Sequence, residues 1–225
     1  MSFYRKVKYF LVHTLMLSNK EAQELIDTGQ VEIDGASIRE NCPLNDSSEI
    51  KIHGHVARKK KEFIYLKFHK PPGFESTLNP GVEGNISGFF TDHAGLSIAG
   101  RLDKHSEGLL LLSNDGKWVE NMCNPKFEKE KEYLVSLDKI PDEVFLKAFS
   151  SGVRIGSYIT ASCTCVALGD MLINVILREG KNRQIRRMCR ALGYGVLKLK
   201  RIRIDSELLS NLRTGESEHF VSIHK

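Results

Sequence analysis

Several features that would assign the chain to a particular class of protein are missing from its 225 residues. No stretch approaches the roughly 20 apolar residues needed to cross a bilayer, and the apolar run at 9–17 lacks a small-residue cleavage site. The sequence therefore predicts neither a membrane span nor a secretory signal. The five cysteines are odd in number and none belongs to a C-x-x-C pair. This pattern argues against a disulfide framework or a zinc ribbon, and it favours the reducing cytoplasm.

Signals for metals and cofactors are also missing. His53, His55 and His69 have no cysteine or carboxylate partner at ligand spacing, so we interpret them as surface residues and expect no metal site. No G-x-G-x-x-G fingerprint marks a strand-to-helix turn, which argues against a dinucleotide cofactor. We therefore expect a protein that needs neither a metal ion nor a cofactor.

What the chain does contain is an uneven distribution of charge. Hydrophobic residues make up 41% and charged residues 27%, as in globular proteins, and the length allows one or two domains. The net charge is only +5, yet residues 178–203 contain ten Lys or Arg and one acid, so the other 199 residues are net negative. Such a segment is typical of a surface that binds a polyanion, although a solvated charged helix would have the same composition.

The first 57 residues are predicted to form a small domain with a marginal core. Ser18 and Glu21 have the spacing of a helix capping box, and Gly29 stands where that helix is expected to end. The dipeptide Asp34-Gly35 predicts a tight hairpin turn between two short strands. Two short helices followed by a few small strands are therefore expected.

A larger domain at 63–225 is expected after a basic linker at 58–62. Strands and helices mix in it without a regular strand–helix–strand repeat, which favours an α+β fold over a doubly wound sheet. The expected strands are FIYLKF (63–68), LLLLS (109–113), EYLVSL (132–137), LINVILR (172–178) and VLKLK (196–200). The expected helices begin near Asn85, cover 142–151 and cover 182–192.

The predicted helix at 182–192 has two different faces. An apolar stripe at i, i+3, i+4 and i+7 is expected to be buried, and it consists of Ile185, Met188, Cys189 and Leu192. The adjoining face carries four arginines at similar spacing, namely Arg183, Arg186, Arg187 and Arg190. Guanidinium groups bind phosphate oxygens or a carboxylate through two parallel hydrogen bonds, so this helix is predicted to recognise an anionic group of defined shape.

Asp103 is a candidate for chemistry because it directly precedes a run of four leucines in GRLDKHSEGLLLLSNDG (100–116). A carboxylate in a loop that enters a buried strand is held firmly and can still face a cleft. Arg101 lies two positions away and could pair with Asp103, which would keep the carboxylate ionised as a nucleophile or base requires. Spacing alone leaves a structural role open, because an aspartate in a turn more often caps local backbone groups.

The stretch around Asp103 resembles the catalytic motif of RNA pseudouridine synthases of the RsuA/RluB/RluE/RluF family. Three more blocks of the family pattern stand in the family's order: KPPG (70–73), KEYLV (131–135) and EGKNRQIRRMCRALGYGVLKLKR (179–201). The chain is most similar to RluF-like members, which act on large-subunit ribosomal RNA. The resemblance implies a central, mostly antiparallel mixed sheet flanked by helices, preceded by a small α/β RNA-binding domain of the ribosomal-protein S-four type.

The resemblance also implies a reaction and three catalytic residues. A specific uridine would be isomerised to pseudouridine without a cofactor, after its base leaves the stack. Asp103 would be the nucleophilic aspartate, Tyr133 the tyrosine that stacks on the target base, and Arg186 the basic residue that pairs with the catalytic carboxylate. Attack on the ribose and elimination to a glycal both remain open.

Five further positions match residues that the resemblance implies for substrate binding. Arg101 would help to hold the nucleotide flipped out, and Leu199 would form an apolar wall under the uracil. Lys70, Arg183 and Arg187 would face the RNA backbone. The implied partner is ribosomal RNA, and a cytoplasmic monomer is expected because no long apolar seam is evident.

The N-terminal domain departs from the family pattern. SNKEA stands at 18–22 where relatives usually carry an S-R-R-E-A type of sequence, and residues 1–57 have a net charge of −2. This balance is unusual for an RNA-binding domain, so the domain could instead be a degenerate unit that packs on the larger one. The alternative function for the whole chain is a non-catalytic RNA-binding or ribosome-assembly protein on the same fold.

Overall fold

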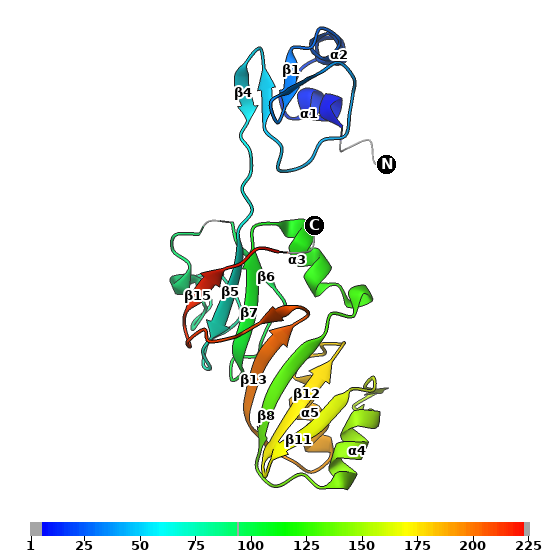
Figure 1. Ribbon diagram of the computed structural model, residues 1–225, viewed down its shortest axis with the longest axis vertical. Coiled ribbons are helices and arrows are strands. Elements are labelled where there is room, and N and C mark those ends of the chain that lie inside the picture. Colours follow the sequence, from blue (N-terminus) through cyan, green and yellow to red (C-terminus); the bar gives the residue numbers. More distant parts are fainter. Residues whose placement is uncertain (1–5, 94, 223–225) are drawn as a thin grey trace. The chain divides into compact units, whose positions relative to one another are not determined.

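The computed structural model describes residues 6–93 and 95–222, and the chain divides between Phe63 and Ile64 into two compact units (Figure 1). None of the helices in these described residues is long and apolar enough to cross a membrane. Each unit has its own hydrophobic core.

The N-terminal unit consists of two helices and a four-stranded antiparallel sheet. Its elements are α1 (Val7–His13), α2 (Asn19–Asp27), β1 (Val31–Ile33), β2 (Ala36–Ile38), β3 (Ile50–Ile52) and β4 (His55–Arg58), with strand order β2-β1-β3-β4. The predicted capping box is confirmed, because the Glu21 backbone N–H donates to Ser18 Oγ and the Ser18 N–H donates to the Glu21 carboxylate. The predicted hairpin at Asp34-Gly35 is confirmed by the pairing of β1 with β2.

The C-terminal unit is built on a mixed sheet with the strand order β11-β12-β8-β13-β7-β5-β15. Two short strands, β6 and β14, pair with β7 and β13, and a separate hairpin pairs β9 with β10. All pairs are antiparallel except β13 with β7, so the predicted α+β class with a mostly antiparallel mixed sheet is confirmed. The strands are β5 (Tyr65–Lys70), β6 (Ser97–Ala99), β7 (Glu107–Ser113), β8 (Lys131–Leu137), β9 (Arg154–Ile155), β10 (Tyr158–Ile159), β11 (Thr164–Gly169), β12 (Leu172–Leu177), β13 (Val196–Ile204), β14 (Glu207–Leu208) and β15 (Ser217–His219).

Strand β7 is buried on both faces and separates two cores. Leu110 and Leu112 belong to one core, whereas Leu109 and Leu111 belong to the other. A strand covered on both sides needs a continuous apolar run, which explains the four consecutive leucines. Because the strand leads directly out of the segment that contains Asp103, its burial fixes one end of that segment.

Helices α4 (Glu143–Ser151) and α5 (Gln184–Ala191) pack into the same core as Tyr133, Val135 and Val175 of the sheet (Figure 1). Asp142 caps α4, and Gly152 follows its last residue with φ +102°, so the prediction for 142–151 is confirmed. The predicted apolar stripe of α5 is also confirmed, since Ile185, Met188 and Cys189 are buried.

Three sequence predictions are corrected by the structure. The segment after Asn85 forms only a 3-10 turn at Ser87–Phe89, because Asn85 holds the Ser87 N–H through its side chain as a local turn. Helix α3 (Gly116–Cys123), capped by Asp115, was not predicted. His69 is buried instead of lying at the surface, and its ring pairs through Nδ1 with the Leu212 carbonyl at 2.8 Å.

Candidate active site

Asp103 lies in the segment that connects β6 to β7, which we call the catalytic loop (residues 100–108). Leu102 is buried, whereas its two neighbours are not: Arg101 is exposed and Asp103 is half-buried. Side chains alternate along extended backbone, so Arg101 and Asp103 lie on the same outer side of the loop. No ion pair joins these two described side chains within 4.0 Å, in contrast to the pairing that spacing suggested.

The backbone of the catalytic loop is fixed by side chains from other parts of the unit. Ser76 Oγ donates to the Leu102 carbonyl at 2.7 Å and accepts from the Leu102 N–H at 3.0 Å. Arg186 Nη2 donates to the His105 carbonyl at 3.1 Å and reaches Ser106 Oγ at 3.5 Å. The Asp103 carboxylate itself accepts no hydrogen bond from another described side chain or N–H. The loop therefore holds Asp103 by its backbone and leaves its oxygens available.

Arg201 is the most extensively bonded of these anchors, and it is only 1% exposed. Its guanidinium donates to the carbonyl oxygens of Gly100, Arg101 and Leu109 at 3.1, 3.2 and 2.8 Å. Gly108 must pass this strand closely: it has φ +110°, and a Cβ atom there would lie 2.2 Å from the Arg201 carbonyl oxygen. Arg201 thus joins both ends of the catalytic loop to β13.

Lys70 corrects a prediction, because it is fully buried and cannot face an RNA backbone from this position. Its Nζ donates to the carbonyl oxygens of Pro71 and Lys104 at 2.8 and 3.3 Å, so it holds the catalytic loop from inside. Burial lowers the pKa of Lys70 to about 8, and the nearby charges of Glu75 and Asp103 oppose that fall. The ammonium therefore lies within electrostatic reach of the candidate nucleophile.

Arg186 lies on α5 at the rim of the same loop and is half-buried. Burial lowers its pKa, and the like charge of Arg183 adds to that effect, whereas the charge of Asp103 opposes it. Its Nη1 donates to the Val196 carbonyl at 3.0 Å, but its buried Nε has no partner among the described residues. Arg186 and Asp103 interact through their charges without an ion pair within 4.0 Å.

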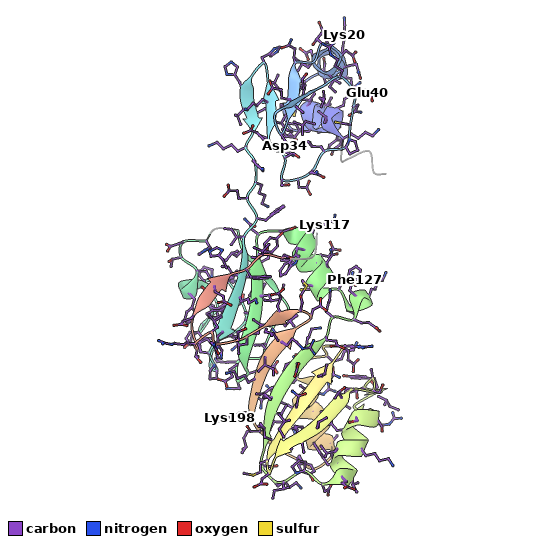
Figure 2. The ribbon with its side chains drawn as sticks, in the orientation of Figure 1. Lys20, Asp34, Glu40, Lys117, Phe127 and Lys198 are labelled. Carbon is purple, nitrogen blue, oxygen red and sulfur yellow. The ribbon has the colours of Figure 1, made fainter. Side chains whose placement is uncertain are left out.

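Tyr133 and Leu199 lie on neighbouring strands, and their side chains face the same core as α5. Leu199 is paired with Val135, and Tyr133 is paired with Arg201, the residue that holds the catalytic loop. Tyr133 is 8% and Leu199 6% exposed, so they form the floor beside the loop and not an outer surface. Lys198, next to Leu199, is exposed and extends from the beginning of β13 (Figure 2).

Arg183 and Arg187 are exposed at the beginning of α5. Arg183 precedes the helix with φ +50° and its side chain makes no capping bond, so it does not share the helical face that its spacing predicted. Arg187 lies within the first turn, donates to the Ile155 carbonyl at 3.2 Å and stands 6.0 Å from the centre of the Tyr158 ring. Both guanidinium groups can reach an anion in solvent.

Sequence reasoning did not identify two of the loop anchors, Ser76 and Arg201. The available signal for Arg201 was its place in a strand whose neighbour Leu199 is apolar, where a buried arginine requires carbonyl partners. No local pattern marks Ser76, whose partner Leu102 lies 26 residues away. Among the described residues, no group of His, Cys, Asp or Glu has the arrangement of a metal site.

Comparisons with known proteins agree on one family. The RNA pseudouridylate synthase family profile matches residues 64–191. The dual-specificity RNA pseudouridine synthase RluF of Escherichia coli (strain K12) is 32% identical over 94% of this chain and 73% of its own length. The ribosomal large subunit pseudouridine synthase B of Bacillus subtilis (strain 168) is 30% identical, over 94% and 90%. A crystal structure of a pseudouridylate synthase, 27% identical, covers 96% of both chains with a TM-score of 0.68.

Proposed function

Because the chain belongs to the RNA pseudouridylate synthase family, we propose that it isomerises a specific uridine to pseudouridine in ribosomal RNA of the large subunit. One of the two bacterial relatives is named for the large ribosomal subunit, and the other is a dual-specificity RNA enzyme. The exposed arginines before and in α5 fit a polyanionic substrate of this kind.

The observation that carries the proposal is the combination of a fixed backbone and a free carboxylate at Asp103. Ser76, Arg186 and Arg201 hold the loop, so the carboxylate has a defined position before substrate binds. A carboxylate that serves only as a structural cap would accept hydrogen bonds from nearby N–H groups. Asp103 accepts none from the described residues, and this availability is what a nucleophile needs.

In the proposed reaction, the bond between the ribose and ring nitrogen one breaks and a bond to ring carbon five forms. Asp103 either attacks the ribose or begins elimination to a glycal. After the uracil turns over and rejoins the ribose, the proton on carbon five leaves and nitrogen one gains a proton, so the product is an isomer. Arg186 and Lys70 offset the charge of the carboxylate, and no redox step occurs.

The uridine must leave its base stack to reach Asp103, at a cost of roughly a few kcal/mol. In the proposal, Tyr133 stacks on the base and contributes about 1–3 kcal/mol, and Leu199 forms an apolar wall that excludes water from the ribose. Arg101 holds the flipped nucleotide, and Arg183 and Arg187 bind backbone phosphates.

The N-terminal unit has a second place in the proposal, as an RNA-binding domain of the ribosomal-protein S-four type. Its two helices and small sheet are a self-contained module. The basic residues at 58–61 would add positive charge that the module itself lacks. We propose that the whole chain works as a cytoplasmic monomer, where ribosomal RNA is accessible to it.

The test measures tritium release from ribosomal RNA transcripts labelled at carbon five of uridine, because only attachment through that carbon releases the label. The protein should release tritium without an added cofactor, and Asp103→Asn should abolish release while leaving RNA affinity unchanged. Asp170→Asn, an exposed aspartate in the turn between β11 and β12, is the matched control and should retain full activity.

Two other outcomes would contradict the proposal in different ways. Tritium release that persists in Asp103→Asn would remove Asp103 from the nucleophile role. Salt-sensitive RNA binding by the unchanged protein with no release from transcripts or subunit precursors would favour a non-catalytic RNA-binding protein.

A further inference from the structure

A groove beside the catalytic loop has no part in the reaction proposed above. It has a volume of about 720 Å³ and is lined by the segments 75–78, 82–83 and 96–98 together with Arg101. That volume lies within the range of about 300–1,000 Å³ that is typical of sites for small molecules. The groove belongs entirely to the C-terminal unit.

The groove is directly connected to the candidate nucleophile. Arg101 lines it, and Asp103 stands two residues further on the same outer side of the loop, at most about 7 Å away along the backbone. Ser76, another lining residue, holds Leu102 between them through two hydrogen bonds. Whatever occupies the groove is therefore fixed at a short, constant distance from the reacting nucleotide.

The walls of the groove suit a flat aromatic ligand. Leu78, Val82, Leu96 and Ile98 line it, and each is half-buried, so apolar side chains remain accessible inside. The floor is ordered, because the Glu75 N–H donates to the Gly84 carbonyl at 2.7 Å and the Ile86 N–H to the Thr77 carbonyl at 3.1 Å. Unstacked RNA bases bind on surfaces of this kind through their faces.

The polar groups of the groove are less usual for a protein that binds RNA. Glu75 and Glu83 both line it, and neither carboxylate accepts a hydrogen bond from a described residue. Carboxylates repel phosphate, so they are unsuited to the RNA backbone, but they accept hydrogen bonds from donor groups on base edges. Glu75 also faces the charge of the buried Lys70, whereas no such partner is seen for Glu83.

We propose that this groove binds the base of a nucleotide next to the target uridine and selects guanine, an inference that rests on the proposed function. Guanine presents two adjacent donors, N1–H and the 2-amino group, which match the two oxygens of a carboxylate. Adenine and cytosine place an acceptor nitrogen beside their amino group, and that nitrogen repels a carboxylate. Arg101 neutralises the phosphate between the two nucleotides, and the groove thereby contributes to the choice of the modified uridine.

The experiment measures binding and does not require turnover. Fluorescence anisotropy gives the affinity of the full chain for the labelled heptaribonucleotide AAGUGAA and for its match with inosine at both guanosines, which removes only the 2-amino groups. The unchanged protein should bind the guanosine RNA about tenfold more tightly. The double variant Glu75→Gln, Glu83→Gln should reduce that ratio to below about twofold, and Glu83→Gln alone should reduce it in part.

Glu218→Gln is the matched control, because Glu218 is exposed on β15 and lies outside the groove lining. It should keep the full preference for guanosine. Equal binding of the two RNAs by the unchanged protein, including no binding of either, would overturn the proposal, as would a preference that survives the double variant. Tritium release separates the two hypotheses: release without guanosine preference leaves the enzyme standing and removes the groove, whereas preference without release does the reverse.

Discussion

The catalytic loop and the beginning of α5 lie next to each other and are constructed in opposite ways. Every anchor of the loop is directed at its backbone, from Ser76, Arg186 and Arg201. At the beginning of α5 the backbone is less constrained: Arg183 has no capping bond, and its side chain is exposed. One region fixes a few atoms in place, and the other presents charge to solvent.

This difference reflects two physical requirements of the proposed reaction. A nucleophile must be held close to its productive position, because a misplacement of about 1 Å can cost a factor of about 100 in rate. Phosphate binding depends on charge number and tolerates movement, because counterion release contributes most of the affinity. The comparison predicts that substitutions at the loop anchors affect rate and stability, whereas substitutions at the exposed arginines affect affinity and its dependence on salt.

The largest effect is expected for Gly108→Ala. Its Cβ atom would lie 2.2 Å from the Arg201 carbonyl oxygen, at a backbone φ of +110°. We expect a loss of more than about 4 kcal/mol in the free energy of unfolding, measured by urea denaturation. Gly100→Ala is the control, because its φ is +87° with no atom within 4 Å, and it should cost about 1–2 kcal/mol from backbone strain alone. Equal losses in the two variants would contradict the close approach.

Arg201→Met should have the next largest effect. The substitution leaves three buried carbonyl groups without a donor and should reduce the free energy of unfolding by about 3 kcal/mol. Tritium release should fall by about 100-fold, because both ends of the catalytic loop lose their connection to β13. Arg201→Lys should recover part of the stability but little activity, since one ammonium cannot reproduce the planar three-point contact. Full activity in the lysine variant would show that charge alone suffices.

Lys70→Met tests the buried ammonium through pH. The folded protein holds the pKa of Lys70 at about 8, below the ordinary value of 10.5, so between these values the unfolded chain binds a proton that the folded protein does not. The free energy of unfolding of the unchanged protein should therefore rise relative to Lys70→Met above pH 8, by about 2 kcal/mol at pH 10, and stay level below pH 8. Urea denaturation at pH 7, 8, 9 and 10 measures this difference. A difference that does not vary with pH would mean that Lys70 has its ordinary pKa.

Ser76→Ala should have a smaller effect, confined to one residue of the loop. Removing the hydroxyl leaves the N–H and carbonyl of buried Leu102 without their partner, at a cost of about 1–2 kcal/mol in the free energy of unfolding. Tritium release should fall about tenfold, because Leu102 adjoins Asp103. Ser157→Ala, at an exposed position between β9 and β10, should change neither quantity. Unchanged turnover in Ser76→Ala would show that the other anchors position Asp103 without it.

The smallest effect is expected for Arg183→Ala and Arg187→Ala. Each should weaken RNA binding a few-fold and reduce the slope of log affinity against log salt by about one, with stability nearly unchanged. Lys147→Ala, an exposed lysine on α4, serves as the control and should leave the slope as it is. A large loss of turnover without a change in the salt slope would place the two arginines with the loop anchors instead.

The sequence predicted elements best where a pattern is local. The apolar stripe of α5, the capping box of Ser18 and the leucine run of β7 depend on neighbours a few residues apart, and all three were found. The helix expected near Asn85 failed because the Asn85 side chain holds the Ser87 N–H in a turn that ends after three residues.

The sequence could not predict how basic residues divide between surface and interior. Lys70 and Arg187 are both single cations next to apolar residues, yet one is fully buried and the other exposed. Burial of Lys70 depends on carbonyl groups up to 34 residues away, including that of Lys104. Long-range contacts of this kind leave no periodic signal, so the loop anchors became visible only in the structure.

The order in which the chain is synthesised follows from the position of Arg201. The bond from its guanidinium to the Gly100 carbonyl spans 101 residues, and the bond from Arg186 to His105 spans 81. During translation, the aspartate therefore emerges long before the groups that fix it, and contacts of such separation form late. An enzyme proposed to modify ribosomes thus acquires its active site only when β13 has left the ribosome that makes it.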